Sequence, residues 1–177
     1  MTYKPDYPFE GEPAPGETRE VAPGVWWLRM PLPFKLNHIN LWLLDDGDGW
    51  TIVDTGVQND EIKACWETIA EKHFVEKPVK RVIVTHFHPD HVGLAGWLCE
   101  KHGVELTMTL AEWTQTRLNT LETPESKIEQ MLPFYIKAGF DAEQMELVKG
   151  RGAYYKQIVS TPPHQFNRIE EGDEIDI

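Results

Sequence analysis

Cysteine is scarce in this 177-residue sequence, which contains only Cys65 and Cys99. Both lie in segments with the apolar spacing of amphipathic helices, so a disulfide framework is not expected and a reducing compartment is the simpler interpretation. The sequence also lacks an apolar run long enough to span a bilayer, and its first residues lack the apolar core of a secretory signal. We therefore expect a cytoplasmic protein that has no membrane partner.

Basic residues are outnumbered, because 17 Lys and Arg face 29 Asp and Glu and give a formal net charge of −12. A field of this sign repels nucleic-acid phosphates and anionic lipids, so neither is an expected partner. A bound divalent cation reverses the sign locally, so an anionic small-molecule substrate stays compatible with the charge. The length suits one domain with a real core.

Proline is concentrated near the start of the chain, where five prolines occur in the first 24 residues. We expect residues 1–24 to form an extended arm and residues 25–177 to form the ordered domain.

Strand and helix patterns alternate through the first part of that domain. Runs rich in aromatic and branched residues predict strands at 25–30, 39–44, 50–54, 81–84 and 105–109. Apolar residues at helical spacing predict helices at 60–73 and 92–102. This alternation predicts an α/β layered fold.

The second part of the domain changes character. Residues 110–160 are mostly of helical pattern and are expected to form a helical lid or insertion, whose Trp113, Tyr135, Tyr154 and Tyr155 either line a substrate pocket or pack between helices. Residues 172–177 look like a turn that enters a new strand.

The strongest chemical signal is a cluster of four possible metal ligands within six residues: His86, His88, Asp90 and His91. They lie between a buried strand and the start of a helix, and Pro89 restricts His88 to an extended conformation. Imidazole nitrogen and carboxylate oxygen suit zinc, and also iron or manganese, better than calcium or magnesium. Asp90 alone fits a helix N-cap equally well, but four such residues in this context favour a metal site.

Asp54 is a further candidate, since it ends an apolar strand and precedes Thr55 and Gly56. A carboxylate at that place is suited to orient a metal-bound imidazole. The alternative is an aspartate that only forms the turn before glycine.

The H-x-H-x-D-H pattern of residues 86–91, preceded by the Asp-Thr-Gly of residues 54–56, resembles the first two signature motifs of the metallo-β-lactamase superfamily. The resemblance spans residues 25–109 and, more weakly, a closing strand at Glu174. It implies an αββα sandwich with a metal pair, commonly zinc, at one edge of the two sheets. It also implies roles for individual residues: His86 and His88 as ligands of the first metal, Asp90 and His91 as ligands of the second, and Asp54 as the buried carboxylate.

The resemblance further implies a hydrolase in which a metal-bound hydroxide attacks an ester, thioester, lactone or phosphoester, with Asp90 as the catalytic residue that holds the hydroxide. His88 stands where the di-iron oxygen-reducing branch usually has glutamate, which favours the hydrolase side. The family's remaining ligands are expected beyond Ile177, so the sequence resembles the N-terminal portion of a truncated sandwich with a helical insertion.

Two alternatives follow from the same observations. An incomplete sandwich would leave an apolar sheet face uncovered, which predicts a binding-only chain that forms a homo-oligomer or needs a complementing partner. The other alternative is an iron-dependent thiol or persulfide oxidoreductase on the same scaffold.

Overall fold

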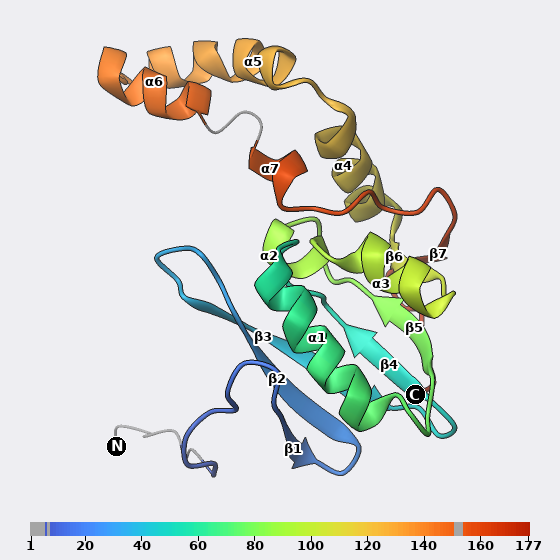
Figure 1. The fold of residues 1–177 in the computed structure, drawn as a ribbon. Helices are drawn as coiled ribbons and strands as arrows, with labels where there is room; N and C mark the ends of the chain where they lie inside the picture. The colour runs from blue at the N-terminus through green and yellow to red at the C-terminus, as the bar shows by residue number, and fades with distance from the viewer. Residues whose placement is uncertain (1–5, 7, 151–153) are drawn as a thin grey trace, which may run out of the picture.

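The computed structural model describes residues 6, 8–150 and 154–177, and these form one seven-stranded sheet with neighbouring helices (Figure 1). The strands lie in the sheet in their order along the chain. β1 to β4 pair antiparallel and β4 to β7 pair parallel. The strand bounds are β1 Thr18–Ala22, β2 Val25–Pro31, β3 His38–Asp45, β4 Trp50–Val53, β5 Val79–Ile83, β6 Leu106–Thr109 and β7 Phe166–Ile169.

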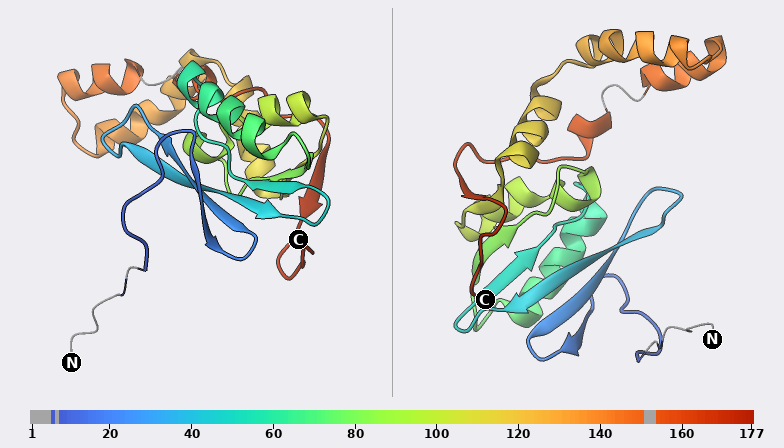
Figure 2. Two further views of the ribbon diagram at one scale, coloured as in Figure 1. Left: turned by 60° about the horizontal axis from the view of Figure 1, so that its bottom comes forward. Right: turned by 180° about the vertical axis from the view of Figure 1, so that it is seen from behind.

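The helices fall into two groups. α1 and α3 cover one face of the sheet, whereas α4, α5, α6 and α7 lie beyond the ends of β5 and β6, on the side where α2 lies (Figures 1 and 2). The helix bounds are α1 Asp60–His73, α2 Pro89–Val92, α3 Ala95–His102, α4 Leu110–Leu121, α5 Pro124–Lys137, α6 Ala142–Gly150 and α7 Tyr154–Gln157. None of the described helices is long and apolar enough to cross a membrane.

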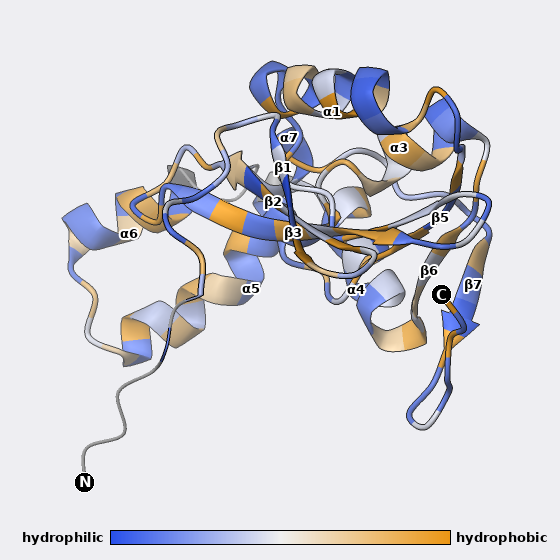
Figure 3. Cartoon of the chain, turned by 90° about the horizontal axis from the view of Figure 1, so that it is seen from below, coloured by the Kyte–Doolittle hydropathy of each residue, from blue (hydrophilic) through white to orange (hydrophobic). Residues whose placement is uncertain are grey.

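The core lies between the sheet and α1 and α3. Alternate residues of each strand point to this side, and cross-strand pairs such as Leu28 with Leu41 and Leu43 with Ile52 are fully buried. Hydrophobic positions run along the central strands in Figure 3, and the outward side of α1 is largely hydrophilic. The predicted α/β layered fold is therefore confirmed for the described residues.

The opposite face of the sheet is also apolar but only half-buried. Trp27 pairs with Trp42, which pairs with Val53, and all three are partly exposed. Seen from behind, β2 to β4 lie in front of α1, and no described helix covers them (right panel of Figure 2). The described residues thus supply one sheet and one helical layer of the αββα arrangement.

α1 has the bounds that the sequence predicts, because each end has a specific partner. The Asn59 side chain accepts a hydrogen bond from the backbone N–H of Ile62 (2.8 Å), which caps the first turn. At the other end, the indole N–H of Trp50 donates to the carbonyl of His73 (2.8 Å). The end of the helix is thereby attached to the start of β4.

The expected extended arm at residues 1–24 needs correction, since Thr18–Ala22 forms β1. This strand pairs with β2, and Thr18 Oγ1 lies 2.8 Å from His73 Nε2 at the end of α1. The surrounding prolines concealed a short segment whose hydrogen-bond partners come from later in the chain. Residues 1–5 and 7 of the arm lie outside the described residues.

The predicted helix at 92–102 is two helices, α2 and α3, with a break at Gly93 and Leu94. A Cβ on Gly93 would lie 2.4 Å from the carbonyl oxygen of Gly56. The backbone at Gly93 therefore lies closer to the backbone at Gly56 than a residue with a side chain would allow. This approach turns the chain and brings α2 against the end of β4.

The last residues also differ from the expectation. The turn forms, because the N–H of Asp173 donates to the carbonyl of Glu170, but the described residues after it are not a strand. The strand lies before the turn instead, as β7, where Phe166 stacks on Trp113 of α4 at 4.6 Å between ring centroids. Only two of the four residues of β7 are apolar, so its pattern was too weak to recognise.

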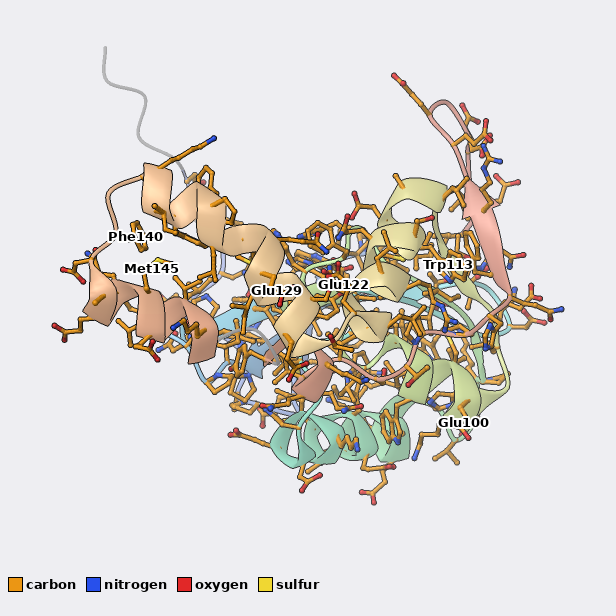
Figure 4. All side chains as sticks on the ribbon, turned by 90° about the horizontal axis from the view of Figure 1, so that it is seen from above. Glu100, Trp113, Glu122, Glu129, Phe140 and Met145 are labelled. Carbon is orange, nitrogen blue, oxygen red and sulfur yellow. The ribbon has the colours of Figure 1, made fainter. Side chains whose placement is uncertain are left out.

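Residues 110–160 are mostly helical in the part that the structure describes, as α4 to α7, whereas 122–123, 138–141 and 158–160 connect these helices or follow them; residues 151–153 lie outside that part. The Thr109 hydroxyl caps α4 by accepting from the N–H of Glu112 (3.4 Å). Phe140 and Met145 lie between α5 and α6, which form a helical hairpin (Figure 4).

Core burial predicts the effect of truncating leucines in two helices. Leu98 of α3 is 0% exposed and Leu121 of α4 is 66% exposed. We expect Leu98→Ala to lower the free energy of unfolding by about 2–5 kcal/mol, because a buried leucine leaves a cavity, and Leu121→Ala to change it by less than about 0.5 kcal/mol. Urea unfolding of both variants measures this difference, and equal losses would contradict the described core.

Candidate metal centre

The candidate centre lies where the parallel strands β4 and β5 end side by side. Asp54 follows β4, and Thr85 and His86 follow β5 after one residue. Asp90 and His91 belong to α2, which begins immediately after His88. His88 is extended (φ −61°, ψ 141°), as the following proline predicts, so the loop stays open until the helix starts.

Asp54 is the residue around which these segments are arranged. Its backbone is left-handed (φ 62°), a conformation that aspartate tolerates better than most residues, and its N–H donates to the carbonyl of Ile83 (2.9 Å). Its side chain is 7% exposed and meets two partners. Oδ1 accepts from the N–H of Thr85 (2.8 Å), and Oδ2 lies 2.8 Å from Nδ1 of His91.

The two residues after Asp54 bind α2. The Thr55 hydroxyl and N–H both donate to the carbonyl of His91 (2.7 and 2.8 Å), and the N–H of Leu94 donates to the carbonyl of Gly56 (3.0 Å). The Asp-Thr-Gly motif therefore places the helix that carries two of the candidate ligands.

The hydrogen bonds determine which nitrogen of each imidazole is available. The Thr85 hydroxyl donates its hydrogen to Asp54. Nδ1 of His86 lies 2.9 Å from the Thr85 hydroxyl oxygen and therefore donates to that oxygen. Nδ1 of His91 likewise donates to the Asp54 carboxylate. When each ring is neutral, its lone pair is then on Nε2, and a neutral imidazole is the form that binds a metal.

The candidate ligands form two pairs of donor atoms. Nε2 of His86 and Nδ1 of His88 are 2.9 Å apart, and Nε2 of His91 is 3.6 Å from Oδ2 of Asp90. The rings of His86 and His91 lie close together, with centroids 4.0 Å apart. The structure therefore places the four candidate ligands close to one another, and their division between two metals stays a prediction.

These pairs fit zinc in donor type and spacing. Two nitrogens each about 2.0–2.1 Å from a tetrahedral zinc ion are about 3.3 Å apart, close to the distance between the His86 and His88 nitrogens. Among the described residues, no three His, Cys, Asp or Glu side chains already form a complete ligand set. The described residues thus offer two neighbouring pairs of candidate donors.

Burial and charge separate the pKa values of the two histidines. Burial is the largest influence on His91 and by itself lowers its pKa, but the hydrogen bond and charge of Asp54, with a further contribution from Asp90, raise the pKa above the usual value. Burial lowers the pKa of His86, and the neighbouring His91 and His88 lower it further. His86 is therefore the more readily available neutral ring.

Sequence reasoning missed two residues that bind the ligand loop. Thr85 links Asp54 to His86, although its residue type carries no metal-ligand signal. The Glu112 carboxylate of α4 accepts from the N–H of Phe87 (2.8 Å), from 25 residues away in the sequence. Only a three-dimensional structure connects these positions.

An apolar cavity of about 520 Å³ adjoins the ligand loop at Pro89 and is lined by Phe34, Pro89, Tyr154 and Tyr155. Phe34, between β2 and β3, meets Tyr154 edge to face, with centroids 6.1 Å apart. Of the four aromatic residues proposed for a pocket, Tyr154 and Tyr155 line this one. Trp113 packs on β7, and Tyr135 contacts the ring of Phe140.

Removing the charge of Asp54 provides a test of these electrostatics. In metal-free protein, we expect Asp54→Asn to lower the pKa of His91, because burial then acts without the opposing carboxylate; asparagine also tolerates the left-handed backbone. We expect Asp90→Asn to lower the pKa of His91 less, since Asp90 makes the smallest of the contributions that raise this pKa. NMR titration of the imidazole signals measures both shifts, and an unchanged His91 pKa in Asp54→Asn would contradict the described contact.

Comparisons with known proteins find solved structures that are similar to this chain. A crystal structure of a β-lactamase domain protein from Burkholderia ambifaria is 43% identical, with a TM-score of 0.79, and the match covers 97% of this chain and 48% of that one. The metallo-β-lactamase family protein TTHA1429 from Thermus thermophilus is 25% identical, with a TM-score of 0.69, over 89% of this chain and 50% of that one. The chain therefore spans about half the length of each of these structures.

Two curated proteins match shorter parts of this chain. A probable metallo-hydrolase, YqjP of Bacillus subtilis, is 32% identical over 68 residues, which are 38% of this chain and 21% of that protein. A linear primary-alkylsulfatase of Pseudomonas is 34% identical over 61 residues, which are 33% of this chain and 11% of that protein. Residues 35–175 match the family model of the metallo-β-lactamase superfamily. With this match and the seven-stranded sheet, the chain belongs to the metallo-β-lactamase superfamily and has its hydrolase-like fold.

Proposed function

We propose that this protein is a metal-dependent hydrolase that uses zinc and cleaves an ester, thioester, lactone or phosphoester. The observation that carries the proposal is the orientation of the histidines. Thr85 and Asp54 engage Nδ1 of His86 and His91, which leaves Nε2 of each ring available on the side of the other candidate ligands.

Each pair of ligands has its own role. His86 and His88 would hold a first ion, and Asp90 and His91 would hold a second. A divalent metal in such a site supplies a Lewis acid and lowers the pKa of bound water to about 7. The Asp90 carboxylate, which is partly exposed, accepts a hydrogen bond from the attacking water and orients it. Asp54 orients His91 by accepting a hydrogen bond from its Nδ1.

The apolar cavity suggests the kind of substrate. Its volume lies within the range of small-molecule sites, and three of its four lining residues are aromatic. Pro89, between two candidate ligands, forms part of its wall. We therefore propose that the substrate carries an apolar aryl or alkyl group beside the bond that is hydrolysed. The match to a linear primary-alkylsulfatase supports an apolar chain next to an ester group.

Metal analysis tests the proposed centre. We expect purified protein to contain or take up zinc, and His86→Ala to weaken zinc affinity by more than about 100-fold, because removing a direct ligand should cost more than removing a residue that only supports one. His164→Ala, at an exposed histidine, is the matched control and should keep the wild-type affinity. Mass spectrometry of the metal content and chelator competition measure both.

Two results would contradict this function. Protein that binds no transition metal would exclude a metal-dependent reaction. Iron as the sole native metal, together with oxygen consumption in the presence of a thiol or persulfide, would favour the oxidoreductase instead.

Truncation of one wall of the cavity tests the substrate class. We expect Phe34→Ala to lower kcat/KM about tenfold for an aryl or long-chain acyl ester, since about 1.4 kcal/mol of apolar contact is lost, but to have little effect on the acetyl ester. Phe140→Ala, on the α5–α6 hairpin, serves as the control. Equal losses for both esters would show that the cavity does not bind the apolar group.

A further inference from the structure

Phe87 stands between the two ligands proposed for the first metal, His86 and His88, and both of its backbone polar groups have distant partners. Its N–H donates to Oε2 of Glu112 (2.8 Å), and its carbonyl accepts from the hydroxyl of Tyr155 (2.7 Å). Glu112 belongs to the first turn of α4 and Tyr155 to α7, so both partners come from the helical segment. We refer to these two hydrogen bonds as the Phe87 clamp.

The clamp acts on both sides of Phe87. A peptide group is planar and moves as one unit. The N–H of Phe87 belongs to the peptide plane that follows His86, and its carbonyl belongs to the plane that precedes His88. Fixing both planes fixes the direction in which each histidine side chain leaves the backbone.

The loop has few other means of holding this geometry. Residues 84–88 are neither helix nor strand, so their polar backbone groups need partners outside regular structure. Asp54 binds the N–H of Thr85, and the carbonyl of His88 accepts the first hydrogen bonds of α2. Between these points, the two described hydrogen bonds of the Phe87 backbone are those of the clamp.

Both partners are suited to their roles. Glu112 is held by the start of α4, where Thr109 caps its N–H and the Thr116 hydroxyl donates to its carbonyl (2.9 Å). Burial raises the pKa of Tyr155 to about 12, so the hydroxyl remains protonated and donates at neutral pH. The acceptor and the donor therefore match the N–H and the carbonyl that they meet.

We infer that Glu112 and Tyr155 are positioning residues of the metal centre, which hold His86 and His88 in place through the backbone of Phe87. Helices α4 and α7, which carry these residues, then help to form the metal centre. This inference rests on the proposed function, since it requires that His86 and His88 bind a metal.

Zinc affinity of the 177-residue chain, measured by competition with a chromophoric chelator, tests the inference. We expect Tyr155→Phe and Glu112→Ala each to weaken the affinity roughly ten- to a hundredfold, the usual cost of losing a residue that supports a ligand. Glu112→Gln should restore most of it, because the amide oxygen still accepts from the N–H of Phe87. If the affinity depended on the charge of Glu112 and not on this hydrogen bond, Glu112→Gln would not restore it.

A second readout is independent of metal. In metal-free protein, Glu112→Ala should accelerate hydrogen exchange of the Phe87 amide, whereas Glu112→Gln should leave it slow. The matched controls are Tyr135→Phe and Glu129→Ala on α5, which remove the same groups from the same helical segment and should change neither readout. If Glu112→Ala does not fold, Tyr155→Phe, which removes one oxygen atom, decides the question by zinc affinity.

The outcomes separate the inference from the proposed function. Wild-type protein that binds no zinc overturns both. Wild-type protein that binds zinc, with Tyr155→Phe or a folded Glu112→Ala binding it equally well, overturns the inference alone and leaves the proposed hydrolase intact.

Discussion

The Asp54 carboxylate joins three segments that would otherwise have no common point. It accepts from the backbone after β5 and from the imidazole at the start of α2, while its own backbone ends β4. A buried carboxylate without such partners would be costly, so these hydrogen bonds and the positions of the segments depend on one another. The left-handed turn at this residue directs the side chain inward, and the following Thr55 and Gly56 then bind the helix. These contacts of Asp54 and the two residues after it bring the candidate ligands together.

The ligand loop is bound from two sides by different parts of the chain. The sheet side supplies Asp54 and Thr85, which act directly on the imidazoles of His91 and His86. The helical side acts on the Phe87 backbone between the ligands. Asp54 belongs to the first signature motif and Thr85 directly precedes the second, whereas Glu112 and Tyr155 belong to helices that follow later in the chain. The ligand loop is therefore held by contacts to the side chains of its histidines and by contacts to its backbone.

The sequence predicted the features that depend on local chemistry. The helix at 60–73 could be predicted with its bounds because Asn59 supplies its own cap, and the ligand cluster could be recognised because four donors occur within six residues. The strands β1 and β7 could not be predicted, since their short segments become strands only by pairing with distant neighbours. The contact of Glu112 with Phe87 was hidden for the same reason: a glutamate in the first turn of a helix is explained equally well by capping.

Tyr155 has two surroundings at once, because its ring lines the apolar cavity and its hydroxyl contacts the ligand loop. A molecule that enters the cavity and displaces α7 therefore also acts on the backbone beside His86 and His88. Such coupling is reciprocal: by whatever factor an occupant changes the affinity for the metal, the metal changes the affinity for that occupant by the same factor. If the centre binds a metal as proposed, this one phenol group would make the filling of the cavity and the loading of the centre two parts of a single thermodynamic cycle.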